Sequence, residues 1–366
     1  MSWFSWPVCL LILLAEAFVL SLLLTPLARR IGQRAGFMDQ PGERKIHHQP
    51  IPRSGGMAIF ASFIIVLLVN ACAAWLLRDR LGEGLVHAHN IPSKLSELGG
   101  VLAGAIWIFF VGVIDDRRPL SPRTKLICQL LATLPLLFAG VQLTSFLPPL
   151  AGKALTVCWV VLIINSLNLL DNMDGLSAGI AAICSAVFAW IAFSTAQWYI
   201  AAMFVILAGS LLGFLRYNFN PASVFMGDGG SMFIGYMLAT LAILTTYYEA
   251  APGDMRAPTG FPVIMPIVVL GVPIFDTVSV CWIRCREGRP LSQGDTSHFS
   301  HRLAALGLSQ RKAVLFIYLV TACVGLSALP FQSLSLPQAI VYSFQIVLWF
   351  LIIFNLERLG LKNSDG

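Results

Sequence analysis

The chain has 366 residues, of which 57% are hydrophobic and only 11% are charged. Soluble domains carry charge at about a quarter of their positions, so this composition excludes an ordinary soluble protein. The formal net charge of +6 does not indicate a nucleic-acid partner, because the basic residues cluster beside apolar runs, as they do in membrane proteins.

Eleven apolar stretches in the sequence are predicted to be membrane spans, which need about 20 residues each. They cover residues 8–28, 56–77, 98–114, 126–147, 155–170, 175–195, 199–215, 231–247, 261–283, 313–330 and 338–356. Backbone groups inside a bilayer must be hydrogen-bonded internally, so we expect helices and an all-α fold. No soluble domain fits between two spans, so residues 1–366 are predicted to form one polytopic integral membrane domain. The first run lacks a preceding basic residue, which favours a span over a cleavable leader.

The eight cysteines are scattered, mostly inside apolar runs, and no C-x-x-C pair occurs among them. Zinc sites commonly use closely spaced cysteine or histidine pairs such as C-x-x-C. The pattern therefore predicts small packing residues.

The basic residues give the spans an orientation. With the N-terminus outside and the C-terminus inside, 19 of the 24 Lys and Arg residues fall on the inside. The positive-inside rule therefore predicts a multi-pass protein with this orientation. An odd number of spans is consistent with termini on opposite sides.

Acidic residues gather on the same inner face. Eight aspartates lie at or near inside ends of spans: Asp39, Asp115, Asp116, Asp171, Asp174, Asp228, Asp276 and Asp295. A carboxylate at the membrane interface is costly unless it is paired or metal-bound, so these residues are functional candidates. Salt bridging to nearby Lys and Arg is the alternative for any one of them. Carboxylates in spans can also mark the path of a transported ion, although transporter sites lie near the midplane rather than at span ends.

Three segments carry most of the predicted chemistry. In the first, Asp115 and Asp116 are adjacent at the end of the third span, and like charges disfavour each other unless a cation offsets them. Arg123 and Lys125 follow and could hold phosphate charge.

In the second segment Asn165, Asn168 and Asp171 recur every three residues, so they are predicted to share one helix face. Asp174 opens the next helix, and Gly175 after it permits a close approach. Four polar groups at the end of an apolar span are difficult to explain by packing.

The third segment is the short loop from Asn218 to Ser231. Its glycines leave backbone N–H groups open at a helix start, which suits an anion. Mg²⁺ is commonly held by one or two carboxylates together with substrate phosphates. We therefore expect Asp174 and Asp228 to share a Mg²⁺ ion, which Mn²⁺ can replace, with a diphosphate substrate.

Two basic loops complete the inner face. The first contains Arg44, Lys45, His47 and His48, and the last contains His298, His301 and Arg302. Phosphate contacts and plain solvated loops are both open readings, whereas zinc would need three or four convergent ligands.

The segments GVIDDRRPLSPRTK, NSLNLLDNMDGL and NFNPASVFMGDGGS, in this order with the two basic loops, resemble the polyprenyl-phosphate N-acetylhexosamine-1-phosphate transferase family. Its members start O-antigen, common-antigen and teichoic-acid synthesis, and they include the translocase of peptidoglycan synthesis. The resemblance covers residues 10–330, so span 338–356 is an addition to the common core.

The resemblance implies roles for single residues. Asp115 and Asp116 match the paired catalytic aspartates, the first being the base for the lipid phosphate, and Asp174 and Asp228 match the metal ligands. Substrate-binding positions are matched by Arg44, Lys45, His47, Lys125, Asn168, Asp171, Asn218, Phe225, His298, His301 and Arg302. The chain departs from the family pattern at Asn172, which is usually Gly, and at Ser300, which is usually the middle His of the last loop.

The implied enzyme transfers N-acetylhexosamine 1-phosphate, with GlcNAc 1-phosphate expected, from a UDP-sugar to undecaprenyl or another polyprenyl phosphate and releases UMP. A one-step transfer and a covalent aspartyl intermediate are both open. The resemblance implies a place in the bacterial inner membrane, with catalytic loops in the cytoplasm. Expected partners are the two substrates, the bilayer and a second copy of the chain in a homodimer, but no nucleic acid.

Overall fold

The computed structural model describes residues 5–41, 49–76, 91–143, 148–246, 264–290 and 297–364. Its elements in chain order are α1 (Trp6–Ala35), β1 (Met38–Asp39), β2 (Ile51–Pro52), α2 (Gly55–Leu76), α3 (Ile91–Arg117), α4 (Pro122–Phe138), α5 (Pro149–Leu170), α6 (Leu176–Ser194), α7 (Trp198–Asn218), α8 (Gly227–Thr246), α9 (Met265–Val269), α10 (Gly271–Arg286), α11 (Phe299–Ala305), α12 (Gln310–Leu326), the 3₁₀ helix η3 (Leu329–Gln332) and α13 (Leu336–Ser364). Among the described residues, the only sheet is the short antiparallel ladder of β1 and β2. The predicted all-α class is confirmed.

Nine helices within the described ranges are long and apolar enough to cross a membrane: α1, α2, α3, α5, α6, α7, α8, α12 and α13. The helices α4 and α10 have 17 and 16 residues. At 1.5 Å per residue they reach only about 25 Å, slightly less than the hydrocarbon core of about 30 Å. The chain is a multi-pass membrane protein, and the count of eleven spans and the single-domain organisation stay predictions.

Two predicted spans have different bounds in the structure. The stretch 126–147 was expected to be one helix, but α4 ends at Phe138 because Gly140 turns the backbone into the left-handed region at φ 81°. The stretch 261–283 contains two helices, α9 and α10, separated at Leu270. Pro273 has no N–H to donate to the carbonyl of Val269, and its ring crowds that carbonyl, so a continuous helix is disfavoured there.

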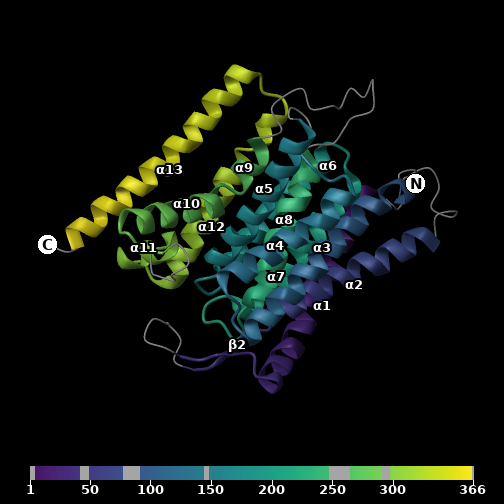
Figure 1. Cartoon of the computed structure of the whole chain (residues 1–366), viewed down its shortest axis with the longest axis horizontal. Helices are drawn as coiled ribbons and strands as arrows, with labels where there is room; N and C mark the ends of the chain where they lie inside the picture. Colours follow the sequence, from purple (N-terminus) through teal and green to yellow (C-terminus); the bar gives the residue numbers. More distant parts are fainter. Residues whose placement is uncertain are drawn as a thin grey trace.

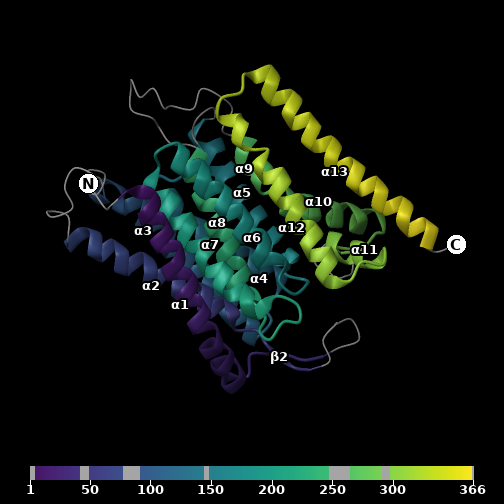
Figure 2. The same cartoon turned by 180° about the vertical axis from the view of Figure 1, so that it is seen from behind.

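Helix α8 occupies the centre of the bundle. In the most apolar stretch of α8, 89% of the residues are buried inside the protein, whereas only 6% are buried in the corresponding stretch of α13. The helices α2, α3, α5 and α6 pack against α8, and α13 lies along one side of the molecule (Figures 1 and 2). The outward face of α13 is apolar, as expected for a helix that faces lipid.

The first turn of α8 is held very closely by two other helices. A Cβ atom on Gly112 of α3 would lie 2.5 Å from the carbonyl oxygen of Asp228, and one on Gly56 of α2 would lie 2.3 Å from the amide nitrogen of Gly230. Neither position can carry a larger side chain without moving backbone. The glycines therefore fix the start of α8, which carries a predicted metal ligand.

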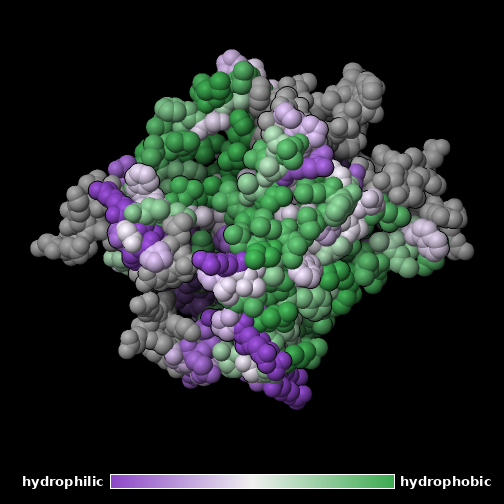
Figure 3. Space-filling view, in the orientation of Figure 1, coloured by the Kyte–Doolittle hydropathy of each residue, from purple (hydrophilic) through white to green (hydrophobic). Residues whose placement is uncertain are grey.

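Hydrophobic residues cover most of the surface in the view of Figure 3. Strongly hydrophilic residues gather toward the end of the bundle where β2 and α11 lie, around a hollow. The polar chemistry is thus concentrated at one end of the helices.

Candidate active site

A cavity of about 400 Å³ opens at this end of the bundle, between the C-terminal ends of α3 and α5 and the N-terminal end of α8. The described residues that line it are Asp39, Ile51, Arg53, Asp116, Asn168, Asp171, Asn172, Met173, Asp174, Asn218, Asn220, Pro221, Ala222, Phe225, Gly227, Asp228, His301 and Gln310. The three segments singled out in the sequence therefore meet in one place. Asp115, Lys125, His298 and Arg302 are not part of this lining.

Asp116 lines the cavity and also caps α8. Its Oδ1 accepts a hydrogen bond from the Asp228 amide at 2.8 Å, and its Oδ2 accepts one from the Gly229 amide at 3.0 Å. The first amides of a helix have no partner within the helix, so a carboxylate from α3 here replaces a local cap. Gly227 before them adopts φ 77°, and a Cβ there would lie 2.6 Å from Asp116 Oδ2.

Asp115 is 4% exposed and faces Lys125. Its Oδ1 accepts from the Leu120 amide at 2.7 Å, and its Oδ2 forms an ion pair with Lys125 Nζ. The same ammonium group lies 2.8 Å from Asp228 Oδ2. Lys125 of α4 therefore bridges carboxylates from α3 and α8.

Asn168 places the other oxygen of Asp228. Its Nδ2 donates to Asp228 Oδ1 at 2.9 Å and to Ser231 Oγ at 2.9 Å. With Lys125 on Oδ2, the Asp228 carboxylate is oriented from two sides. Asn168 thus contacts the predicted metal ligand directly.

Asp174 is held by the loop before α8. Its Oδ2 accepts from Asn220 Nδ2 at 3.0 Å and from the Ala222 amide at 3.0 Å. Asn220 also donates to Gln310 Oε1 at the start of α12, at 2.8 Å. The loop, α12 and the turn between α5 and α6 are thereby joined around one carboxylate.

Asp171 follows the last residue of α5. Burial is the main reason that its pKa is raised to about 7; the charges of Asp228 and Asp174 act in the same direction, and Arg53 opposes them. Among the residues that the structure describes, the lining contains five carboxylates (Asp39, Asp116, Asp171, Asp174 and Asp228) and one Arg, Arg53. Clustered negative charge is costly without compensation, so the cavity is suited to a cation.

The carboxylates that line the cavity fit Mg²⁺ if substrate phosphates complete its coordination. Among the described residues there is no group of three or more His, Cys, Asp or Glu that could hold a metal by itself. Asp174 and Asp228 nevertheless line the same cavity, and Mg²⁺ often takes one or two carboxylates with substrate phosphates supplying further oxygens. The site therefore suits an ion that arrives with a diphosphate.

Residues of the β1–β2 ladder, with Arg53 directly after it, line one side of the cavity. Arg53 pairs with Asp39 at 2.5 Å, and the Phe225 amide donates to the Pro52 carbonyl at 2.8 Å. Asp39, Arg53 and Phe225 all line the cavity. The predicted substrate contacts Arg44, Lys45 and His47 lie outside the described residues.

Asn218 is 3% exposed and supports the site from within. Its Oδ1 accepts from the Gly175 amide at 3.1 Å, and its Nδ2 donates to the Val224 carbonyl at 3.0 Å. The side chain joins the start of α6 to the loop before α8. A substrate contact by Asn218 stays a prediction.

The last loop divides into two parts. His301 lines the cavity, whereas His298 is 4% exposed and bonds to Asp276 of α10. Arg302 bonds to the Ser297 carbonyl and, at 3.3 Å, to Ser279 Oγ. The predicted substrate roles of His298 and Arg302 are untested, and their contacts lie behind the cavity wall.

Sequence reasoning overlooked three cavity residues. Arg53 was not among the predicted substrate contacts, although it follows the first basic loop and lies two residues before α2. Asn220 lies inside the N-F-N-P motif, so a signal for it was present. Gln310 opens an apolar helix and carries no local signal that would have found it.

The sequence profile of glycosyl transferase family 4 matches residues 98–246, which contain every candidate from Asp115 to Asp228. The chain is 34% identical to the probable undecaprenyl-phosphate N-acetylglucosaminyl 1-phosphate transferase of Bacillus subtilis, over 97% of this chain and 94% of that protein. The chain belongs to glycosyl transferase family 4. The resemblance stated from the motifs is confirmed.

Two further members of family 4 show the breadth of the similarity. The decaprenyl-phosphate N-acetylglucosaminephosphotransferase of Mycobacterium tuberculosis is 32% identical over 85% of this chain and 80% of its own length. The undecaprenyl-phosphate alpha-N-acetylglucosaminyl 1-phosphate transferase of Escherichia coli is 23% identical over 94% of this chain and 90% of its own. The names of all three relatives specify a polyprenyl phosphate and N-acetylglucosamine.

Proposed function

We propose that the protein transfers N-acetylglucosamine 1-phosphate from UDP-N-acetylglucosamine to a polyprenyl phosphate, which starts a cell-surface glycan. The names of the three relatives support the sugar and the lipid acceptor. The observation that carries the proposal is the cavity, in which carboxylates from α3, α8 and the α5–α6 turn meet at one end of the bundle, beside a lysine. An ion transporter would place such groups near the bilayer midplane.

The reaction exchanges one phosphoanhydride for another. An oxygen of the lipid phosphate forms a bond to the β-phosphorus of the donor, and the bond from that phosphorus to the bridging oxygen breaks. UMP leaves with the bridging oxygen, and the lipid carries the diphosphate sugar. The main task of the protein is to bring two anions together and offset their charge, as in other phosphoryl transfers.

Asp174 and Asp228 are the residues that we propose to hold Mg²⁺, with Mn²⁺ as a substitute. Bound there, the ion would supply positive charge to the diphosphate oxygens. This proposal is supported by the five lining carboxylates, which would otherwise repel an anionic donor.

Lys125 and Arg53 are the described cations best placed for the phosphates. Lys125 is oriented by Asp115 and Asp228, and Arg53 by Asp39. The hydrogen bond that Asp115 accepts from the Leu120 amide and its ion pair with Lys125 support a role in orienting Lys125. We therefore propose Asp115 as a positioning residue, in place of the proton acceptor that the resemblance implied.

The direct test is UMP release by the purified full-length protein with UDP-N-acetylglucosamine and undecaprenyl phosphate. Omission of the lipid should abolish release, and a donor panel with UDP-N-acetylgalactosamine should show the sugar preference. UMP release that does not depend on the lipid phosphate, or no release with any polyprenyl phosphate, would contradict the proposal.

We also propose that the cavity faces the cytoplasm of a bacterial inner membrane. Arg118, next to the site, and Ser333, at the opposite ends of the helices, are both exposed. In a cysteine-free background, Arg118→Cys should react with an impermeant thiol reagent only after the membrane is opened. Ser333→Cys should react in intact spheroplasts, and the reverse pattern would invert the orientation.

A further inference from the structure

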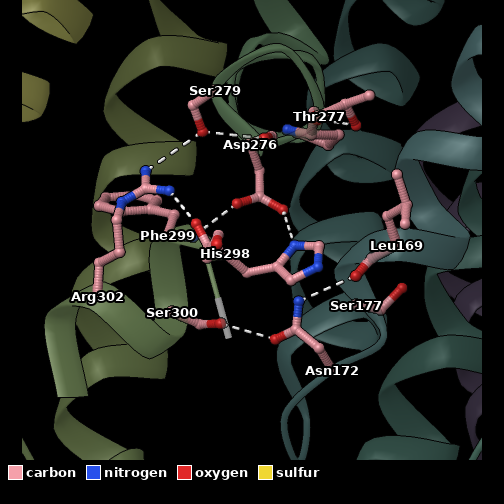
Figure 4. Close-up of polar contacts among 12 residues, drawn as sticks. Leu169, Asn172, Ser177, Asp276, Thr277, Ser279, His298, Phe299, Ser300 and Arg302 are labelled. Atoms are coloured by element: carbon pink, nitrogen blue, oxygen red, sulfur yellow. Dashed lines mark hydrogen bonds and ion pairs between the residues drawn. The ribbon is translucent and has the colours of Figure 1, made fainter. Parts of the chain in front are cut away.

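Hydrogen bonds attach the segment from His298 to Arg302 to neighbouring elements. His298 and Phe299 bond to Asp276 of α10, Ser300 bonds to Asn172, and Arg302 bonds to Ser279 (Figure 4). The fifth residue, His301, lines the cavity. We call these attachments the α11 clamp.

Asp276 supplies the first anchor. It is 1% exposed; its Oδ2 lies 2.8 Å from His298 Nδ1, and its Oδ1 accepts from the Phe299 amide at 2.6 Å. One carboxylate thus orients the residue before α11 and caps the first residue of α11. The Phe299 ring packs edge-on against Phe275 of α10, with centroids 5.7 Å apart, which adds an apolar contact beside the polar ones.

Asn172 supplies the second anchor. Its Nδ2 donates to the Leu169 carbonyl at 2.9 Å, which turns Oδ1 toward Ser300 Oγ, 2.7 Å away. Asn172 belongs to the turn between Asp171 and Asp174, so this hydrogen bond joins α11 directly to the turn that carries cavity carboxylates. Both partners are the positions at which the chain departs from its family pattern.

The helix α11 has only seven residues, and isolated helices shorter than about 12 residues are marginal in water. Its position therefore depends on tertiary contacts. When contacts on one face are lost, so short a helix is expected to shift, and His301 would shift with it.

We propose that Asp276 and Asn172 are positioning residues that hold His301 toward the donor in the cavity. Asp276 is buried and does not line the cavity. Asn172 does line the cavity, but its Nδ2 and Oδ1 are both hydrogen-bonded within the protein, so we assign both residues a positioning role. The proposal rests on the proposed transferase function, since His301 acts there on the UDP-sugar.

A double-mutant cycle tests the proposal by steady-state kinetics of the full-length protein with UDP-N-acetylglucosamine and undecaprenyl phosphate. The variants are Asp276→Ala, His301→Ala and the pair. The matched control is Thr277→Val, because Thr277 is buried on the same helix and its hydroxyl bonds only within that helix, to the Pro273 carbonyl. Ser300→Ala removes the second anchor and leaves Asp276 in place.

Asp276→Ala is expected to raise the donor KM about 10- to 100-fold, the range for losing a charged hydrogen bond. In the His301→Ala background the same change should alter KM by less than about twofold, since coupled residues are not additive. Ser300→Ala should show a smaller effect with the same non-additivity. Equal effects of Asp276→Ala with and without His301 would overturn the proposal. Should Asp276→Ala fail to fold, Asp276→Asn, which keeps an acceptor for the Phe299 amide, replaces it in the cycle.

A readout without turnover separates this proposal from the proposed function. The modification rate of His301 by diethyl pyrocarbonate, followed by peptide mass spectrometry, should change in Asp276→Ala and Ser300→Ala but not in Thr277→Val. If the wild type releases no UMP and this rate still changes, the transferase function fails and the clamp stands. An unchanged modification rate in both variants would contradict the proposal that the clamp positions His301.

Discussion

The cavity and the α11 clamp are two polar regions of the molecule, and they differ in how many carboxylates they bring together. In the clamp, Asp276 is buried and receives hydrogen bonds from the ring and the backbone of the next helix. In the described part of the cavity lining, five carboxylates stand against one Arg.

The difference matters because uncompensated charge in a low-dielectric setting is costly. The clamp offsets its charge with its own donors, as expected for a part that holds structure. The cavity keeps an excess of negative charge that a cation and a substrate can offset. Substitutions should therefore affect chemistry in the cavity and geometry or stability in the clamp.

The largest effect should follow loss of Asp228. Asp228→Ala removes a proposed metal ligand and one partner of Lys125, so turnover should fall by more than about 10⁴-fold. Asp174→Ala should behave similarly, and EDTA should abolish wild-type activity until Mg²⁺ or Mn²⁺ is added. UMP release measures the loss of turnover, and thermal melting checks that each variant remains folded. Full activity in EDTA would contradict the proposed metal site at Asp174 and Asp228.

Asp115→Asn should reduce kcat by ~10²-fold or more, within the range seen for residues that assist the chemical step, with little change in donor KM. The deficit should be the same at pH 6 and pH 8 if Asp115 orients Lys125. The second pKa of a phosphate monoester is about 6, so a general base becomes less necessary as the pH rises and the acceptor ionises. A deficit that shrinks at pH 8 would therefore favour the proton-acceptor role.

In the clamp, Arg302→Ala should cost about 1–3 kcal/mol of stability and should raise the donor KM of the folded protein less than Asp276→Ala does. The reason is that its guanidinium contacts Ser279, the Ser297 carbonyl and the Phe299 ring. Melting temperature and KM are measured together, with His301→Ala as the matched cavity variant. A large rise in KM without a loss of melting temperature would return Arg302 to the donor site.

The smallest effect is expected for Asn165. It exchanges hydrogen bonds with Gln129 of α4, at 2.8 Å and 3.3 Å, and does not line the cavity. Such pairs between membrane helices contribute about 0.6 kcal/mol on average. Asn165→Leu should therefore keep activity and lower stability slightly, by denaturant titration in detergent. A strong loss of turnover would extend the cavity cluster along α5.

The sequence predicted most of the cavity because its residues lie in three compact motifs, each at the end of an apolar run. Asn168 near the end of α5 and Asp171 just after it both line the cavity, on the side that their spacing indicated. Asn165 shares the spacing but pairs with Gln129. The spacing of polar residues predicts which face of a helix they share, but it does not predict which element packs against that face.

What the sequence determined by itself was the membrane-spanning, all-helical class and the family, because apolar run length and local motifs carry that information without long-range contacts. Tertiary structure alone decided which partners each carboxylate contacts. Asp115 and Asp116 are adjacent, yet one faces Lys125 and the other caps α8 across 112 positions of sequence. The break at Leu270, the place of Arg53 in the lining and the pairing of Asp276 with His298 likewise depend on elements that meet only in the folded bundle. A buried charge takes its role from the donors that surround it, and those donors come from distant parts of the chain.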